Sequence, residues 1–189
     1  ESDPDKLSSF QFGFRANHGT DDFHFALSEL IKARARAGKR TWLVSVDIAN
    51  AFGSIRHATI ICALKARGIS GLLLVALSSL LEGTAYIHSP HCPDAENIRS
   101  QRIKFGVRQG SVLSPLLWGV GYDNILRGLN DTELGVQVLT DRRRVGGVAY
   151  ADDSYLLADD RDGAQKLVDR LGDLAIGEDA YAPDLKFKH

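Results

Sequence analysis

The sequence predicts an α+β fold in which an antiparallel sheet packs on helices. Strand and helix patterns alternate irregularly along the 189 residues, unlike the regular repeat of a parallel sheet. Apolar strand patterns lie on both sides of a turn at Asp152 and Asp153, which indicates a hairpin. With 44% hydrophobic residues and a net charge of −1, the chain fits one globular domain with a sizeable core.

The first two elements are a helix and a strand. Apolar residues keep helical spacing over 20–37, where Thr20 or Asp21 can cap the helix and Gly38 ends it. The apolar residues of 42–47 predict a strand that finishes on an acid.

The middle of the chain is predicted to hold two helices and a strand pair. Residues 57–67 form the first helix, which Gly68 ends, and residues 70–81 form the second. Two strands, 84–88 and 102–107, follow across a loop rich in Pro, His and Asn.

The last part begins with a long helix over 113–129. Pro115 lies in its first turn, where proline is tolerated. The patterns that follow predict strands and a final helix over residues 136–139, 145–150, 154–158 and 162–174.

Composition excludes several classes of protein. No apolar run is long enough for a membrane helix, because Ser78 and Ser79 interrupt the longest one. Two cysteines make no disulfide framework and favour a reducing intracellular compartment. Methionine is absent even at position 1, so we expect a piece of a longer protein. The net charge counts mildly against a nucleic-acid binder, although basic residues cluster within 32–40, 99–108 and 142–144.

Two adjacent carboxylates, Asp152 and Asp153, interrupt an otherwise apolar hairpin. Unpaired buried charges cost several kcal/mol, so such acids need a partner, and clustered carboxylates suit a hard divalent cation. Asp47 ends another apolar strand. If the two strands are neighbours, Asp47 and Asp152 face each other and can hold two Mg²⁺ ions, a pattern used in phosphoryl transfer.

Four blocks in order resemble the reverse transcriptase family, and most closely its non-LTR retrotransposon members. They span most of the chain, and the Arg-Gln-Gly-x-x-Leu-Ser-Pro string is highly specific by itself. The four blocks are Gln11–Arg15 with Thr20, Asp47–Phe52, Gly106–Pro115 and Tyr150–Asp153.

The resemblance implies a polymerase palm with part of the fingers, residues 1–40 joining the fingers to a palm at 41–189. It implies that Asp47, Asp152 and the Ile48 carbonyl are metal ligands, with Asp153 as a third carboxylate. Two Mg²⁺ ions are the implied cofactor, and Mn²⁺ can replace them.

The resemblance also implies the residues of the nucleotide site. Phe52 would be the steric gate that rejects a ribose 2′-OH by clash. Ala51 would let the triphosphate approach the backbone, and Gln109 and Gly110 would line the nucleotide.

Three further residues have implied contacts with nucleic acid. Arg15 is assigned to the fingers or template, Arg108 to template phosphate, and Tyr150 to the primer. Core packing is an alternative for Phe52 and Tyr150, and a salt-bridged surface position is one for Arg15.

The sequence departs from the family pattern at three places. Gly53 stands where many relatives carry Asp, and Asn50 where Lys, Arg or Asp is common. Residues 185–189 look like the start of the family's next block, which includes a lysine thought to protonate pyrophosphate, and that lysine is not placed.

The implied function is RNA-directed DNA polymerase activity of a retroelement, which adds dNTPs to a DNA primer on an RNA template. A membrane is not expected among its partners. Alternatives are a group II intron or retron enzyme, a palm remnant that binds nucleic acid without catalysis, and a nucleotidyl cyclase. An intracellular location is expected, the nucleus if the element is a eukaryotic retrotransposon.

Overall fold

A computed structural model describes residues 7–48, 50–87, 99–138, 143–176 and 187–188. Its centre is a four-stranded antiparallel sheet in the order β6-β7-β1-β8. These strands are β1 (Trp42–Ile48), β6 (Gly147–Tyr150), β7 (Asp153–Ala158) and β8 (Phe187–Lys188). The predicted mixed fold with an antiparallel sheet is therefore confirmed.

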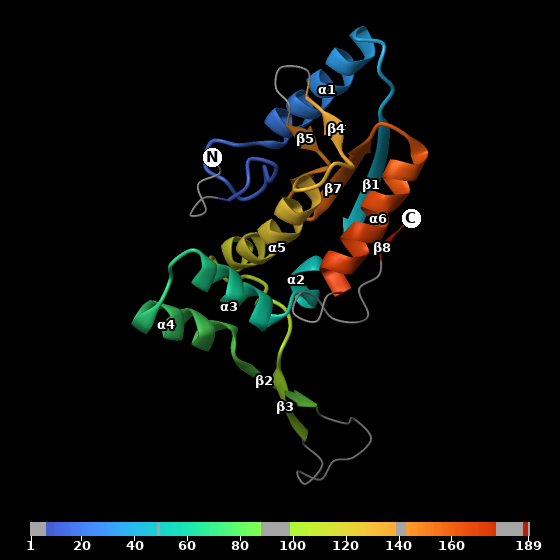
Figure 1. Cartoon of the computed structure of the whole chain (residues 1–189). Helices are drawn as coiled ribbons and strands as arrows, with labels where there is room; N and C mark the ends of the chain where they lie inside the picture. The colour runs from blue at the N-terminus through green and yellow to red at the C-terminus, as the bar shows by residue number, and fades with distance from the viewer. Residues whose placement is uncertain (1–6, 49, 88–98, 139–142, 177–186, 189) are drawn as a thin grey trace.

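Helices cover both faces of this sheet, as Figure 1 shows. On one face, α5 (Ser114–Asn130) and α6 (Arg161–Ile176) pack against alternate sheet residues such as Val46, Leu156 and Ala158. On the other face, α1 (Thr20–Arg36) packs through Phe23 against Leu157 and its neighbours. This division follows from the two-residue period of a strand, which sends successive side chains to opposite faces.

A second group of elements extends from the sheet toward the lower part of Figure 1. The helices are α2 (Ala51–Ser54), α3 (His57–Ala66) and α4 (Gly71–Leu81), and the hairpin strands are β2 (Gly83–Ile87) and β3 (Arg99–Ile103). A separate pair, β4 (Val136–Gln137) and β5 (Arg144–Val145), lies beside α1. Among the described residues, no helix is long and apolar enough to cross a membrane.

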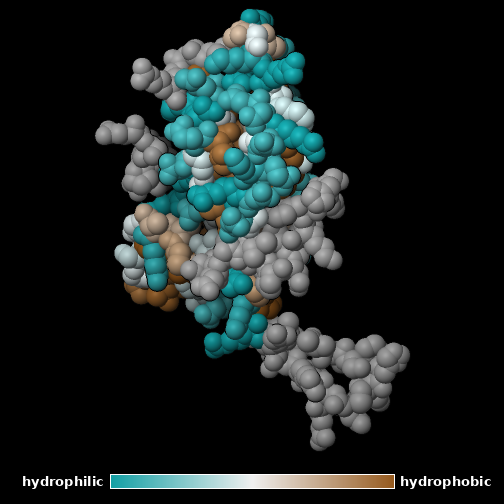
Figure 2. Space-filling model, turned by 45° about the vertical axis from the view of Figure 1, so that its right-hand side comes forward, coloured by the Kyte–Doolittle hydropathy of each residue, from teal (hydrophilic) through white to brown (hydrophobic). Residues whose placement is uncertain are grey.

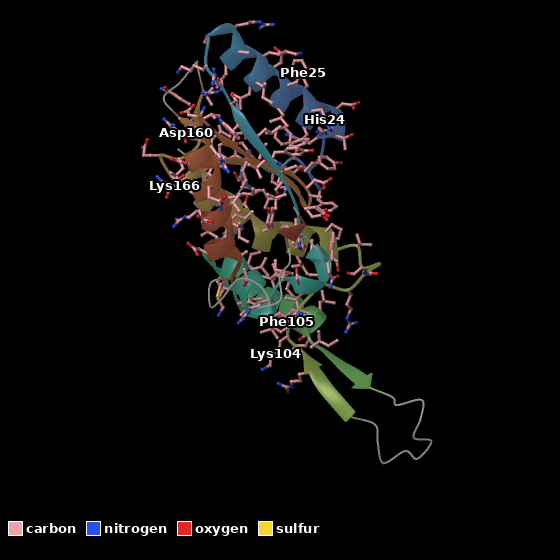
Figure 3. All side chains as sticks on the ribbon, turned by 90° about the vertical axis from the view of Figure 1, so that its right-hand side faces the viewer. His24, Phe25, Lys104, Phe105, Asp160 and Lys166 are labelled. Carbon is pink, nitrogen blue, oxygen red and sulfur yellow. The ribbon has the colours of Figure 1, made fainter. Side chains whose placement is uncertain are left out.

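The surface of α4 is apolar. Leu72, Leu73 and Val75 expose 89%, 58% and 61% of their surface, and apolar residues gather in this part of Figure 2. Beside α4, a cavity of about 790 Å³ lies between α3 and the β2–β3 hairpin, where Lys104 and Phe105 form part of its wall (Figure 3). This cavity is lined by none of the carboxylates that the sequence singled out.

Two strand predictions differ from the structure. The pattern over 145–150 is divided at Gly146, because Val145 belongs to β5, which pairs with β4, whereas β6 of the central sheet begins at Gly147. The sequence pattern extends a strand over 102–107, but β3 ends at Ile103. The chain beyond it is held by α2 and by the residue that follows α2, instead of by β2. Gly106 N–H donates to Ile55 O at 2.7 Å, and Val107 N–H donates to Phe52 O at 2.7 Å. Gly106 takes a positive φ of 80°, a conformation that favours glycine. The predicted ends at His88 and Leu139 lie outside the described residues.

Candidate active site

The end of β1 lies beside the β6–β7 turn. Val46 is paired with Ser154, so the next residue, Asp47, reaches the edge of the sheet where this turn lies. Val44, Val46 and Ile48 pack into the core beneath, and Asp47 therefore belongs to the opposite, more open face. By the same alternation Asp153 shares that face, because Ser154 and Leu156 point into the core.

The β6–β7 turn has two central residues, Ala151 and Asp152, because Tyr150 pairs with Asp153. Ala151 is buried and has a φ of 54°. Two-residue hairpins commonly need positive φ at their first central residue, and glycine is usual there. Asp152 is half-buried and Asp153 is exposed, so the two acids lie in different surroundings.

Electrostatics tie Asp152 to the two other acids. Burial is the largest cause that raises the pKa of Asp152 above its ordinary value, while a hydrogen bond from its own backbone N–H opposes the rise. The negative charges of Asp153 and Asp47 raise this pKa further. Asp152 is therefore close enough to Asp153 and Asp47 to be affected by their charges, and a cation bound beside it would offset that effect.

A layer of buried aromatic residues supports the turn from below. The Tyr122 hydroxyl hydrogen-bonds Ser154 Oγ at 2.6 Å, and burial raises the pKa of Tyr122 to about 12. Trp118 stacks on Tyr122, with ring centroids 4.8 Å apart. Trp118 and Tyr122 belong to α5 and are both fully buried. They form a rigid support beneath the sheet edge that carries the three acids.

Phe52 lies over the same aromatic layer. Its ring stacks on that of Trp118 with centroids 5.4 Å apart, and it packs nearly perpendicular to the Phe14 ring with centroids 5.9 Å apart. Ala51 is buried beside it, and its carbonyl accepts a hydrogen bond from Trp118 Nε1 at 2.9 Å. Asn50 begins this short helix at a φ of 52°. Phe52 is thus half-buried and fixed on one side, with Ala51 closely packed.

The loop with Gln109 and Gly110 is joined to Phe52 through the backbone, by the bond from Val107 to Phe52 O. Gln109 is exposed. Gly110 has a φ of 85°, and a Cβ added there would meet no atom within 4 Å. Its backbone conformation therefore accounts for glycine at this position.

The three basic and aromatic residues assigned to nucleic acid have structural partners. Arg15 donates to Ser8 O and Gln11 O, both at 3.0 Å, within its own segment. Arg108 donates to Glu82 O at 3.1 Å. The ring centroids of Tyr150 and Phe23 lie 6.1 Å apart in the core beneath α1. These contacts give each residue a packing or hydrogen-bonding role, and their contacts with nucleic acid remain predictions.

The sequence did not single out Gln11 as an individual residue, yet the structure places its side chain against the β6–β7 turn. Gln11 Nε2 donates to Ala151 O at 3.1 Å, and Ala151 N–H donates to Gln11 Oε1 at 2.9 Å. Gln11 and Ala151 are 140 residues apart. A glutamine in a predicted loop carries no local signal of such a partner, although it belongs to the first of the four blocks.

The residues present fit a divalent metal ion in their chemistry. Carboxylate and carbonyl oxygens are the ligands that Mg²⁺ and Mn²⁺ prefer, and Asp47, Asp152 and the Ile48 carbonyl supply them at one edge. Ile48 packs its side chain into the core, so only its backbone can contribute. In the described part of the chain, no three acidic, His or Cys side chains are grouped closely enough to hold a metal ion by themselves.

The described residues thus combine an antiparallel sheet, acids at one edge of it and an aromatic ring beside them. Comparison with known proteins then gives the family. The family model described as reverse transcriptase (RNA-dependent DNA polymerase) matches residues 2–180. The chain belongs to the reverse transcriptase family, as the four blocks indicated.

Its relatives are proteins of non-LTR retrotransposons. It is 33% identical over 137 residues to a Pol polyprotein of the type-1 retrotransposable element R2 from Popillia japonica, covering 72% of this chain and 22% of that protein. It is 30% identical over 156 residues to the RNA-directed DNA polymerase of the mobile element jockey from Drosophila melanogaster, covering 80% and 15%. The chain thus spans less than a quarter of the length of each of these relatives.

A solved structure shares the fold. Telomerase from Candida albicans, determined in complex with a fragment of telomeric RNA, superimposes with a TM-score of 0.62 at 12% identity. The match covers 95% of this chain and 32% of the telomerase chain. The likeness extends over almost all elements described above.

Proposed function

We propose that this chain carries the catalytic centre of an RNA-directed DNA polymerase, which adds dNTPs to a DNA primer on an RNA template. The observation that carries the proposal is the meeting of Asp47 with the Asp152 turn at one sheet edge. The family match and the four ordered blocks support it. The palm would comprise residues 41–189, and residues 1–40 would join it to the fingers.

Asp47, Asp152 and the Ile48 carbonyl would hold two Mg²⁺ ions, or Mn²⁺ in their place, with Asp153 close by. Bound there, the ions would lower the pKa of the attacking 3′-OH and neutralise charge on the triphosphate. The carboxylates act by holding their oxygens at the edge of a rigid sheet, because misplacement of reacting groups by about 1 Å can cost on the order of a hundredfold in rate.

The remaining residues would select and orient the nucleotide. The Phe52 ring is held from below by Trp118 and from the side by Phe14, so it resists displacement by a ribose 2′-OH. Gln109 is exposed and free to meet a nucleotide, and Gly110 shapes the backbone of the same loop. Arg15, Arg108 and Tyr150 would contribute at the template and primer.

The retrotransposon relatives lead us to infer the same setting for this chain, an intracellular site of action and, in a eukaryotic host, the nucleus. RNA template and DNA primer would be its partners. Their phosphates would be met by basic clusters despite the net charge of −1, since the distribution of charge governs such binding more than its sum.

Primer extension on an RNA template tests the proposal. With Mg²⁺ and dNTPs, Asp47→Ala and Asp152→Ala should each lower the extension rate by at least about a hundredfold, because each removes a ligand of the reacting centre. Asp173→Ala is the control, since Asp173 is an exposed acid on α6 and should leave the rate unchanged. Extension by either active-site variant at the wild-type rate would refute the site. A cyclic product from ATP or GTP without primer would replace the proposal with a nucleotidyl cyclase.

A further inference from the structure

The Gln11 side chain is buried where its own N-terminal segment, residues 7–19, packs against the β6–β7 turn. Only 1% of its surface is exposed. Its amide makes three hydrogen bonds: Nε2 donates to Ala151 O, and Oε1 accepts from Ala151 N–H and from Gly13 N–H at 2.8 Å. Backbone bonds at Phe12 and Ala149 hold the same segment along β6, each at 2.8 Å.

Ala151 needs such support. It adopts a φ of 54°, which costs an L-residue roughly 1–2 kcal/mol. It is also buried, so its N–H and C=O both require partners. Gln11 provides a partner for both groups, and these bonds stabilise Ala151 in its positive-φ conformation.

Gly13 permits this approach. A Cβ at position 13 would lie 2.2 Å from Ala151 N and 2.8 Å from Ala151 Cα, a clash with backbone that no side-chain movement relieves. The N-terminal segment can therefore contact the turn only with glycine at this position.

The chemistry of the contact selects glutamine. The amide supplies a donor and an acceptor together, whereas an ionised glutamate only accepts and methionine does neither well. The amide is also uncharged, and it lies beside a turn that already carries the acids Asp152 and Asp153. Asparagine carries the same amide on a shorter stem.

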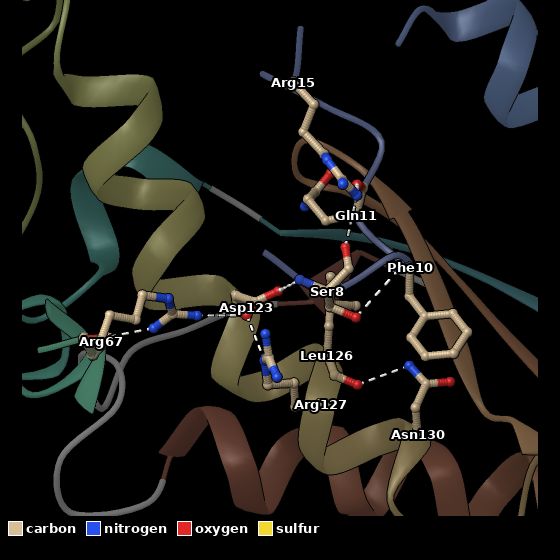
Figure 4. A network of polar contacts seen from close by, with 10 residues as sticks. Ser8, Phe10, Gln11, Arg15, Arg67, Asp123, Leu126, Arg127 and Asn130 are labelled. Atoms are coloured by element: carbon tan, nitrogen blue, oxygen red, sulfur yellow. Dashed lines mark hydrogen bonds and ion pairs between the residues drawn. The ribbon is translucent and has the colours of Figure 1, made fainter. Parts of the chain in front are cut away.

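The segment that bears Gln11 is itself anchored. Ser8 N–H donates to Asp123 Oδ1 at 2.6 Å, and Asp123 is fully buried on α5. Arg67 and Arg127 bond the other carboxylate oxygen at 2.6 and 2.7 Å, and Arg15 holds the carbonyls of Ser8 and Gln11 (Figure 4). The Gln11 amide is thus presented from a fixed base.

We propose that Gln11 is a positioning residue of the catalytic centre. By fixing both polar groups of the Ala151 peptide, it sets the direction in which Asp152 leaves the turn and so its approach to the metal site. This inference rests on the proposed function, because the carboxylate it orients is the one assigned to the metal.

Asn130 provides a matched control at the other end of the same strand. Its amide also bonds backbone on both sides: Nδ2 donates to Gly147 O at 2.8 Å, and Oδ1 accepts from Gly146 N–H at 2.9 Å. Gly147 begins β6, and Ala151 follows the end of that strand. Loss of either amide should lower stability, but only Gln11 contacts the turn that carries Asp152.

The test compares Gln11→Met with Asn130→Leu in the full chain, using two measurements. The first is the hydrogen-exchange rate of the Ala151 amide, read by NMR. The second is the Mg²⁺ concentration that half-saturates primer extension, measured at saturating dNTP. For Gln11→Met we expect at least about tenfold faster exchange and about a tenfold higher Mg²⁺ requirement, the size usual for residues that orient metal ligands. Asn130→Leu should change neither.

Several outcomes would overturn the inference. Unchanged exchange at Ala151 would show that Gln11 does not hold the turn, and faster exchange with an unchanged Mg²⁺ requirement would reduce Gln11 to a structural role. If Gln11→Met does not fold, Gln11→Asn replaces it and must shift both measurements in the same direction. Absence of Mg²⁺-dependent extension in the wild-type chain would instead refute the proposed function, while the exchange comparison would still report on the contact between Gln11 and Ala151.

Discussion

At the scale of single residues, the candidate site depends on side chains held from below. Phe52 is the clearest case, because Trp118 stacks under its ring and Phe14 packs against it with the two rings nearly perpendicular. Asp152 is the second case, since burial and neighbouring charge both act on it. Each leads to a prediction that needs only one substitution.

Phe52→Val should weaken discrimination against ribonucleotides. Removing the ring opens space where a 2′-OH would project, so the ratio of rNTP to dNTP incorporation should rise by about tenfold or more, the usual size of a steric change in a pocket. Single-nucleotide incorporation with matched rNTP and dNTP measures the ratio. Phe25→Val is the control, because Phe25 is 68% exposed on α1 (Figure 3) and is not among the residues assigned to the site. An unchanged ratio in the Phe52 variant would mean that this ring packs and does not select.

Asp152→Asn should stabilise the chain in the absence of metal while abolishing extension. The pKa of Asp152 is raised in the folded state, so the folded chain binds more protons there than the unfolded chain, and stability falls as the pH rises through this range. Asparagine removes that dependence. In thermal unfolding between about pH 4 and pH 7 without metal, the melting temperature of the variant should rise relative to that of the wild type as the pH increases. A variant that is less stable than the wild type at neutral pH would contradict the prediction that Asp152 destabilises the metal-free chain when it is ionised.

At the scale of elements, the N-terminal segment, α3 and α5 meet at Asp123. This carboxylate is fully buried and is bonded by Ser8, Arg67 and Arg127. Breaking a buried ion pair costs about 3–5 kcal/mol, because the remaining charge loses its partner. Since the N-terminal segment also carries Gln11, loss of the Asp123 bonds should loosen the contact of Gln11 with the β6–β7 turn.

Asp123→Asn should therefore lower the free energy of unfolding by about 3 kcal/mol in a denaturant titration. It should also speed hydrogen exchange at Ala151, although Asp123 lies on a different element. Asp131→Asn, an exposed acid at the end of the same helix, should have little effect on either quantity. A loss below about 0.5 kcal/mol would show that the network does not hold these elements together.

The elements themselves were largely predictable, because local patterns determine them. The 42–47 strand, the hairpin around Asp152 and the 113–129 helix each show their period and their ends in the sequence. The prediction of a strand over 102–107 was wrong beyond Ile103, because Gly106 and Val107 bond to Ile55 and Phe52, about fifty residues earlier in the chain. The contacts of Gln11 with Ala151 and of Ser8 with Asp123 span 140 and 115 residues, and no local pattern reports such pairs.

At the scale of the whole molecule, the chain brings acids from β1 and from the β6–β7 turn to one sheet edge and surrounds them with fixed supports. Asp47 and Asp152 could be paired in advance only by assuming that their strands are neighbours, and β1 and β7 are indeed paired. The family match agrees with the four blocks over most of the chain. The central claim is therefore that this edge is a divalent-metal site for templated synthesis.

Single-turnover incorporation tests that claim most directly. The chain is mixed with an RNA template and a DNA primer, one dNTP is added, and the rate is followed as Mg²⁺ is raised, for the wild type and for Asp152→Asn. The account predicts saturable, Mg²⁺-dependent incorporation of only the complementary dNTP by the wild type, and none by the variant. Incorporation independent of Mg²⁺, or an equal rate in Asp152→Asn, would contradict it.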